Sequence, residues 1–235
     1  MKLLNLITFL LLFILFNTVA QSGEVIYQAE ILTPNNKNQK VNTEVLKLLK
    51  SQKKIDYKLI FNTNKSLFKK IKSLKISDKK LHLVEALAGN GLYYFQKNDN
   101  LVLFQTLFSD EYFIIKKTKI DWVITQNSKK IGQYVCYEAR AKKEIETRRG
   151  KSIRNISAWF APDIPYNFGP KEYGYLPGLI IELKEDNLLL KAKEINLSNK
   201  KNIVIRKPTK GINVTQREYD SIVKKVIFNS KRYRQ

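Results

Sequence analysis

The residue types that carry most enzyme chemistry are scarce in this chain. Its 235 residues include one histidine, His82, and one cysteine, Cys136. A histidine-based triad would have to use His82, and no Gly-x-Ser-x-Gly sequence supplies a serine nucleophile. A zinc site would lack its usual ligands, and neither a phosphate loop nor a dinucleotide fingerprint is present. The sequence therefore predicts neither a metal nor a cofactor.

Asp163 and Glu172 are the two carboxylates whose placement could support catalysis, because they flank a loop rich in aromatic residues. Glycosidases use such a pair as an acid and a base, or as an acid and a nucleophile. Two acidic residues also occur by chance on many surface loops. We therefore expect a protein without enzymatic activity, and a carboxylate-type hydrolase is the alternative.

The single cysteine cannot form an internal disulfide. Cys136 lies in the apolar sequence Ile131-Gly-Gln-Tyr-Val-Cys-Tyr, between aromatic and β-branched residues. A free cysteine in such surroundings behaves as a small hydrophobic residue. Burial in a strand is the prediction, and pairing between molecules is the alternative.

The segment from Ala158 to Leu183, here called the aromatic loop, joins two predicted strands and holds four of the six prolines and six aromatic residues. Prolines restrict themselves and the residues before them, so the loop loses little entropy when it becomes ordered. Pro177-Gly178 suits the central positions of a type II turn, because proline fixes φ near about −65° and glycine accepts a positive φ.

Two interpretations of the aromatic loop are open. In the first, it is a folding element that caps the open side of a curved sheet, and its structural motif is Leu176, Pro177, Gly178, Leu179 and Ile180. In the second, it is a preorganised rim that binds a ligand or a partner through Trp159, Tyr166, Phe168, Tyr173 and Tyr175. The two roles can coexist.

The aromatic loop resembles the signature of the GLPGLI family of exported Bacteroidetes-type proteins, written here as Tyr175-Leu-Pro-Gly-Leu-Ile180. Further similar features, spread over most of the chain, are Trp122-Val-Ile-Thr, the Gly-Gln-Tyr-Val-Cys136 sequence, Trp159-Phe160, Ile164-Pro165 and Gly169-Pro170. The signature's first glycine is Tyr175 here, and Gly174 could supply a positive-φ turn after a one-residue shift. The family has no settled activity, so the resemblance implies an exported, uncharacterised protein.

Residues 1–20 read as a secretory signal peptide, with Lys2, an apolar run and Thr18-Val-Ala20 before the expected cleavage point. A retained membrane anchor is the alternative, but the apolar run is shorter than the roughly 20 residues a spanning helix needs. Residues 21–235 contain no repeat or linker and are expected to form one domain without a transmembrane span.

The chain is strongly basic, with 43 Lys and Arg against 21 Asp and Glu and a formal net charge of +22. Such a charge can indicate nucleic-acid binding. Here the lysines are spread through nearly every segment, and export would separate the protein from nucleic acid. We expect no nucleic-acid partner, and instead a solvated basic surface or loose attraction to anionic lipid and polysaccharide.

Period-two alternation predicts many consecutive strands, at 25–32, 55–62, 91–96, 101–108, 111–117, 121–126, 131–142, 152–160 and 179–195. A hairpin turn is predicted at Asn127–Lys130 and another at Lys184–Asn187. Helical spacing predicts a short helix from Val41 to Leu49 with Asn42 as its N-cap, and partly helical structure over 66–88. Thr215-Gln-Arg-Glu218 matches a capping box and predicts a final helix.

The expected fold is mainly β (α+β): a curved antiparallel sheet or half-barrel meander with covering helices, including a C-terminal one. The expected protein is an exported module of the cell envelope, periplasmic or extracellular or peripheral to the outer membrane. It would bind an apolar ligand within the curved sheet. The alternative is a structural or interaction protein whose aromatic loop docks to an outer-membrane partner.

Overall fold

The structure is a computed structural model that describes residues 22–33, 43–71, 83–147, 150–198 and 203–232. Twelve strands in these residues form one sheet in the order β12-β6-β5-β4-β3-β2-β1-β11-β10-β9-β8-β7. Neighbouring strands are antiparallel except β12, which runs parallel to β6. The mainly β fold with a C-terminal helix is therefore confirmed, and the sheet is mixed at one edge.

The strands and helices have the following bounds. The first six strands are β1 (Ser22–Ile31), β2 (Ile55–Asn62), β3 (Lys65–Lys70), β4 (Gly91–Gln96), β5 (Leu101–Phe108) and β6 (Glu111–Lys117). The others are β7 (Val123–Ile131), β8 (Tyr134–Thr147), β9 (Gly150–Ala161), β10 (Leu179–Glu185), β11 (Leu188–Ser198) and β12 (Ile212–Thr215). The helices are α2 (Thr43–Lys50), α3 (Leu83–Ala88) and α4 (Gln216–Arg232).

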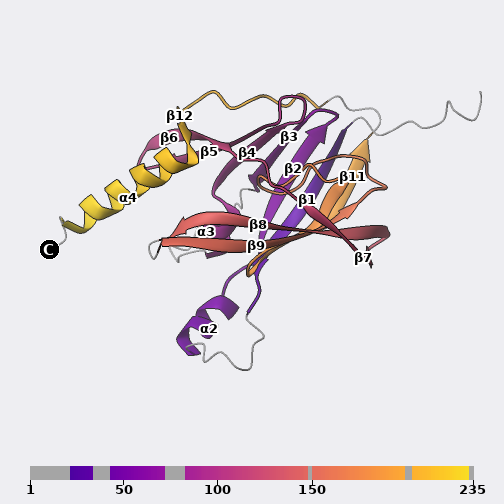
Figure 1. Ribbon diagram of the computed structural model, residues 1–235, viewed down its shortest axis with the longest axis horizontal. Helices are drawn as coiled ribbons and strands as arrows, with labels where there is room; N and C mark the ends of the chain where they lie inside the picture. The colour runs from indigo at the N-terminus through magenta and orange to yellow at the C-terminus, as the bar shows by residue number, and fades with distance from the viewer. Residues whose placement is uncertain (1–21, 34–42, 72–82, 148–149, 199–202, 233–235) are drawn as a thin grey trace, which may run out of the picture.

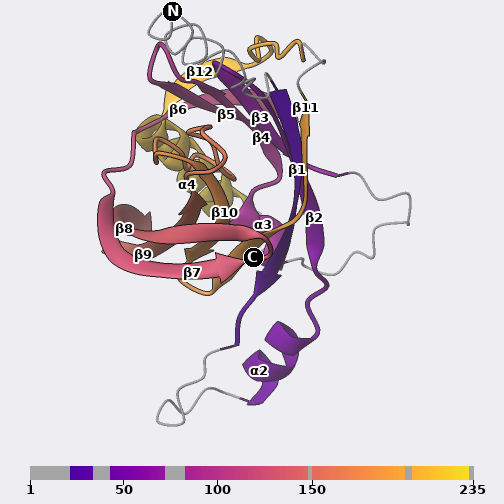
Figure 2. The same cartoon turned by 90° about the vertical axis from the view of Figure 1, so that its right-hand side faces the viewer.

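The sheet curls so strongly that β7, β8 and β9 wrap toward the face of the other strands (Figures 1 and 2). Three irregularities in strand pairing accompany the curl, at Ile26/Tyr27 of β1, at Ile180/Glu182 of β10 and at Ile124/Ser128 of β7. A bulge adds a residue to one strand, which bends it and increases its twist. The apolar face of each central strand turns inward, as the buried Val25, Tyr27 and Ala29 of β1 show.

The sequence located the β7–β8 hairpin but placed its turn wrongly. β7 continues to Ile131, which pairs with Tyr134, so the turn is Gly132-Gln133 and not Asn127–Lys130. Gly132 has a φ of 59°, which suits the two-residue turns that favour hairpins. The polar cluster lies on an edge strand instead, where exposed polar side chains are tolerated. The β10–β11 turn lies within the predicted segment.

The partly helical interpretation of 66–88 is wrong for its first residues, because Lys65–Lys70 is strand β3, paired with β2 and β4. Phe68 is buried there and stacks on Tyr57, with ring centroids 5.1 Å apart. This partner comes from another strand, so local spacing could not reveal it. Helix α3 confirms the helical part from Leu83 onward, whereas 72–82, including His82, lies outside the described residues.

The predicted helices are present where the structure describes them. α2 corresponds to the Val41–Leu49 helix, and the proposed cap Asn42 lies outside the described residues. At α4 the capping box is confirmed: the Thr215 N–H donates to Glu218 Oε2 at 2.7 Å, and the Glu218 N–H donates to Thr215 Oγ1 at 3.2 Å. None of the described helices combines the length and apolar composition of a membrane-spanning segment.

Helix α4 contacts the sheet through its first turns and then points away from it (Figure 1). Tyr219 packs edge-on against Phe113 of β6 and Phe108 of β5, with ring centroids 5.4 and 6.2 Å apart. The short strand β12, which the sequence did not predict, brings the helix to this edge by pairing with β6. A second described contact lies in the third turn of the helix, where Lys224 pairs with Glu146 of β8 at 2.7 Å.

Candidate functional site

The aromatic loop fills the inside of the curled sheet. Tyr166, Phe168 and Tyr173 are 4%, 1% and 0% exposed. Tyr166 packs on Phe61 of β2 at 4.7 Å between centroids, and Phe168 packs on Phe95 of β4 at 5.3 Å. Three of the five predicted binding residues therefore belong to the core, which favours the folding-element interpretation. The remaining two are half-buried, namely Trp159 and Tyr175.

Hydrogen bonds fix the path of this loop. The Asn167 side chain donates from Nδ2 to the Leu176 carbonyl at 2.7 Å, and the backbone carbonyl of Asn167 accepts from the Tyr175 N–H at 2.9 Å. The indole of Trp122 donates to the Gly174 carbonyl at 2.9 Å. Polar backbone groups in an apolar interior need such partners, and these bonds supply them for Gly174, Tyr175 and Leu176.

The structural motif 176–180 enters β10 without the type II turn that the sequence predicted. The Gly178 N–H donates to the Leu176 carbonyl at 2.8 Å, which is a three-residue turn around Pro177, and the Leu179 N–H donates to the Ile164 carbonyl at 3.0 Å. Glycine is required for another reason: a Cβ at Gly178 would lie 2.3 Å from the Ala161 carbonyl oxygen. The motif therefore allows a close approach to the end of β9.

The departure of Tyr175 from the family signature is accommodated without a shift to Gly174. Tyr175 itself has a left-handed φ of 67°. Gly174 meets a different demand, because a Cβ there would lie 2.7 Å from the Asn167 carbonyl oxygen. The ring of Tyr175 packs on Phe95 at 4.6 Å and lies beneath the Lys119 ammonium at 4.7 Å. These contacts offset the strain of a left-handed tyrosine.

Buried ion pairs anchor the loop to the surrounding strands. Lys171 pairs with Glu185 of β10, which also accepts from Arg154 of β9 at 2.7 Å. Glu172 pairs with Lys143 of β8. Burial alone would raise the pKa of Glu172, but Lys143, Lys171 and Lys117 outweigh burial and hold its pKa below the ordinary value.

The structure gives the two predicted carboxylates different surroundings. Glu172 is buried and committed to its ion pair with Lys143. Asp163 is exposed at the start of the loop. Paired catalytic carboxylates face a shared substrate, and nothing in these two environments favours that arrangement.

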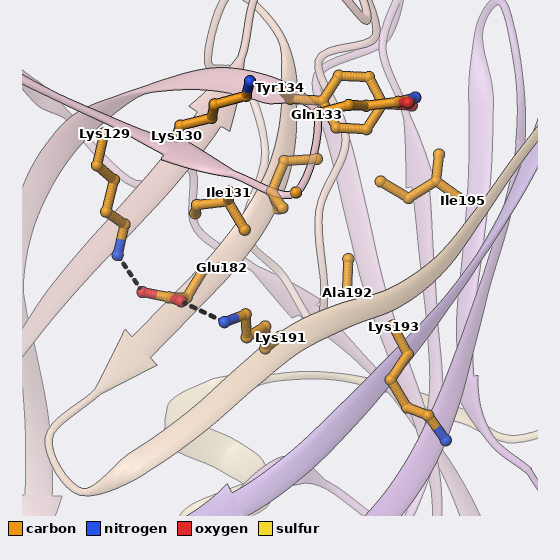
Figure 3. A pocket seen from close by; sticks show the side chains of 12 residues that line it. Lys129, Lys130, Ile131, Gln133, Tyr134, Glu182, Lys191, Ala192, Lys193 and Ile195 are labelled. Carbon is orange, nitrogen blue, oxygen red and sulfur yellow. Dashed lines mark hydrogen bonds and ion pairs between the residues drawn. The ribbon is translucent and has the colours of Figure 1, made fainter.

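A groove lies between the β7–β8 hairpin and strands β10 and β11, with a volume of about 620 Å³ (Figure 3). We call it the hairpin groove. Its apolar lining residues come from the hairpin and from β10 and β11, and they are Ile131, Tyr134, Ile181, Ala192 and Ile195. Ligand pockets typically measure about 300–1,000 Å³ and combine apolar walls with a few polar groups. The hairpin groove has both properties.

Lysines supply the charge of the hairpin groove, from Lys129, Lys130, Lys191 and Lys193. Glu182 is the carboxylate in its lining, and it accepts from Lys129 at 2.7 Å and lies 3.9 Å from Lys191 (Figure 3). Lys193 also lies 3.4 Å from Asp56, outside the groove lining, so two carboxylates face four ammonium groups and a positive excess remains. The groove therefore presents a positive rim beside an apolar wall, which suits an anion that carries an apolar part.

Two residues singled out from the sequence lie near this groove. The Lys129 ammonium sits 4.2 Å from the centroid of Trp159, a favourable cation–π contact. Cys136 is buried, as predicted, and burial raises the pKa of its thiol to about 11. A protonated thiol is a poor nucleophile, so Cys136 acts as a packing residue.

The sequence did not reveal the hairpin groove. Its lysines lie in two pairs far apart in the chain, and both pairs looked like part of a general basic excess. The available signal was their position: one pair directly precedes the Ile131–Tyr134 turn, and the other alternates with Ala192 along a strand. Only the curl of the sheet brings the pairs together.

Comparisons with known proteins agree with this description. A family model described as "Protein of unknown function (Porph_ging)" matches residues 145–182, which contain all of β9 and the aromatic loop up to Glu182. Two solved structures of PNGF-II, in space groups P21 and C2, share the fold with TM-scores of 0.52. Their identities to this chain are 17% and 16%, over 86% and 87% of it.

This chain corresponds to 33% of the length of each PNGF-II chain. At such low identity the likeness concerns the fold alone. No curated protein matches the sequence. The comparisons therefore support a β-rich fold and a family of unknown function.

Proposed function

We propose that this protein is an exported, non-enzymatic binding module of the cell envelope, and that it holds an amphiphilic anion in the hairpin groove. Support for the binding role comes from one observation above all: four lysines and one glutamate surround an apolar wall in a groove of about 620 Å³. An anionic head group would lie at the rim, with its apolar part against Ile131, Ile181 and Ile195.

The proposed ligand position differs from the one expected from the sequence. The inside of the curled sheet is packed by side chains of the aromatic loop, including Ile164, Phe168 and Leu176. An acyl chain there would have to displace close-packed groups, which costs stability. The hairpin groove requires no such displacement.

Residues 1–20 would direct export as a signal peptide, and residues 21–235 would form the mature domain. We also propose membership of the GLPGLI family, since the Porph_ging match covers the loop that carries the resemblance. N-terminal sequencing of the mature protein tests the first of these proposals. Gln21 as the first residue would support export, whereas a retained Met1 on a membrane-embedded chain would contradict it.

The direct test of the groove compares decanoate with decanol, which has a similar chain and no charge. Calorimetric titration below the micelle concentration should show saturable binding of decanoate and much weaker binding of decanol. Reversal of two rim charges, Lys130→Glu with Lys193→Glu, should weaken decanoate binding at least about tenfold, or about 1.4 kcal/mol. Lys207→Glu, at an exposed position outside the groove, should leave it unchanged.

A second variant tests the apolar wall. Ala192→Trp places a large side chain in the groove and should abolish decanoate binding while the melting temperature stays near wild type, because Ala192 is only partly buried. Equal binding of decanoate by all variants would refute the groove as the site. Mass spectrometry of lipids retained after purification would then identify ligands held elsewhere.

Docking through the aromatic loop has less support as the alternative function. Its candidate rings Tyr166, Phe168 and Tyr173 are buried, and buried rings cannot form an exposed docking patch.

A further inference from the structure

A second pocket, of about 310 Å³, lies beside Glu172 of the aromatic loop. We call it the lysine pocket. Lys117 at the end of β6, Lys143 of β8, Glu172 of the loop and Gln216 at the start of α4 contribute to its lining. Four separate parts of the chain thus meet there, and the hairpin groove shares none of these residues.

Lys117 is the half-buried lysine of this pocket without a carboxylate in contact, whereas Lys119 and Lys142, which also line it, are exposed. Its ammonium donates to Gln216 Oε1 at 2.6 Å and lies 5.1 Å from the centroid of Phe104. Among the described residues, no carboxylate oxygen lies within 4.0 Å of it. An amide oxygen and an aromatic face are both neutral groups. The positive charge is therefore only partly exposed to water and has no counter-charge in contact.

Of the three acids that line the pocket, Asp121 and Glu144 are exposed, and Glu172 already pairs with Lys143. Glu172 is 3% exposed, its Oε1 atom accepts from Lys143, and Lys171 adds a further positive charge close by. Asp220, on α4, attracts the Lys117 ammonium weakly and is held by Gln216 at 2.8 Å. Burial lowers the pKa of Lys117. The positive charges of Lys143 and Lys171 lower this pKa further, whereas the negative charges of Glu172 and Asp220 raise it.

We propose that the lysine pocket binds the carboxylate of a small monoanionic ligand, with the Lys117 ammonium as its principal partner. A buried ion is stabilised by an opposite charge in contact, and a carboxylate would complete the unbalanced cluster. Glu172, fixed beside the pocket, would repel a second negative charge. This disfavours dianions such as inorganic phosphate above its second pKa.

The first test uses the unmodified protein. Lactate, lactamide and inorganic phosphate are titrated at pH 8, and the Lys117 side-chain signal is followed by NMR. Lactate should shift this signal saturably and raise the apparent pKa of Lys117, because the bound anion favours the charged amine. Lactamide, similar in size but neutral, should give no shift. Phosphate should bind at least about tenfold more weakly than lactate.

The second test uses variants. Lys117→Met removes the charge but keeps an apolar stem, and it should abolish saturable lactate binding. Lys97→Met, an exposed lysine in the β4–β5 turn, should bind lactate as the wild type does. The groove variant with Lys130→Glu and Lys193→Glu should also retain lactate binding, so failure of the groove proposal and failure of this one are distinguishable.

Three results would overturn the proposal. The first is an unsaturated lactate response up to about 50 mM at low ionic strength, measured on the wild type. The second is equal binding of lactate and lactamide, which would make the carboxylate irrelevant. The third is preference for phosphate, which would indicate general attraction to the basic surface. The wild-type arm decides the matter even if Lys117→Met fails to fold.

Discussion

At Gly178 the backbone passes so close to the end of β9 that no side chain fits. A Cβ atom at this position would lie 2.3 Å from the backbone carbonyl oxygen of Ala161 and 2.6 Å from the carbonyl carbon. Backbone atoms within a sheet cannot move aside as a flexible side chain can. The glycine therefore sets how tightly the aromatic loop joins β10 to β9.

Gly178→Ala is expected to lower the free energy of unfolding by well over 1 kcal/mol, and Gly178→Val by more, because the added carbon meets backbone. Urea denaturation measures both. Gly132→Ala is the matched control: Gly132 also has a positive φ, at 59°, but its Cβ would meet nothing within 4 Å. Its cost should be about 1 kcal/mol from backbone strain alone. Equal effects at the two positions would contradict the steric argument.

Tyr175 combines an unfavourable backbone with favourable ring contacts, and two substitutions separate these contributions. Tyr175→Ala and Tyr175→Gly both remove the contacts with Phe95 and Lys119. Only glycine also relieves the left-handed φ of 67°. The Gly variant should therefore be more stable than the Ala variant by about 1 kcal/mol in thermal or urea unfolding. The reverse order would show that the left-handed conformation is not retained.

At the scale of elements, helix α4 is held at its start by its capping box and by Tyr219, and further along by the pair of Lys224 with Glu146 of β8 at 2.7 Å. The Thr215 hydroxyl accepts from the Glu218 N–H, and the Glu218 carboxylate accepts from the Thr215 N–H. Tyr219 then anchors the helix against Phe113. The stability of this end of the molecule is concentrated in a few contacts.

Thr215→Ala should destabilise α4 by about 1 kcal/mol, since one helix N–H loses its partner. Amide hydrogen exchange should show faster exchange in the first turn of α4 and unchanged protection in β1 and β2. Thr215→Ser, which retains the hydroxyl, should restore most of the protection. Equally faster exchange throughout the sheet of the Ala variant would be incompatible with a local cap.

The elements that sequence reasoning located were those whose determinants are local. The capping box lies within four residues, and the alternation of Val25, Tyr27 and Ala29 lies within five. Strand β3 was missed because Leu67 and Phe68 also fit a helix, and only pairing with β2 and β4 resolves this ambiguity.

Neither candidate site could be predicted in the same way. The hairpin groove and the lysine pocket each join residues from distant strands. Their lysines look alike in the sequence, and only the fold distinguishes a buried lysine from an exposed one. Of the five predicted aromatic residues, Trp159 alone lies against a groove lysine, Lys129.

At the scale of the whole molecule, the buried ion pairs of Glu172 and Glu185 make stability depend on pH. Burial raises the pKa of each carboxyl, but neighbouring cations outweigh it and leave both pKa values below 4.5. A lowered folded-state pKa means that the unfolded state binds protons first. The stabilisation is therefore complete above about pH 4.5 and is lost as the pH falls toward the folded-state values.

Glu172→Gln should lower the free energy of unfolding at pH 7 by about 2 kcal/mol. This value is smaller than the usual cost of breaking a fully buried ion pair, because Lys143 is partly exposed. The difference from wild type should shrink as the pH falls below 4.5, because the unfolded wild-type chain takes up a proton at Glu172 that the folded carboxyl, with its lowered pKa, does not. Urea denaturation at several pH values measures this. Glu144→Gln, whose carboxylate is 75% exposed, should change stability by less than about 0.5 kcal/mol.

The position of β1 in the sheet determines how the chain can be assembled. The strands β1 to β6 form one consecutive meander and β7 to β11 form another, and the two join where β1 pairs with β11. The second part also reaches across to place β12 on β6. Each meander forms by pairing strands that follow one another in the chain. The pairings of β1 with β11 and of β6 with β12 bring distant segments together, so they are expected to form more slowly. If the chain were cut between β6 and β7, the two pieces would still pair at both edges of the first meander, through β1 with β11 and through β6 with β12.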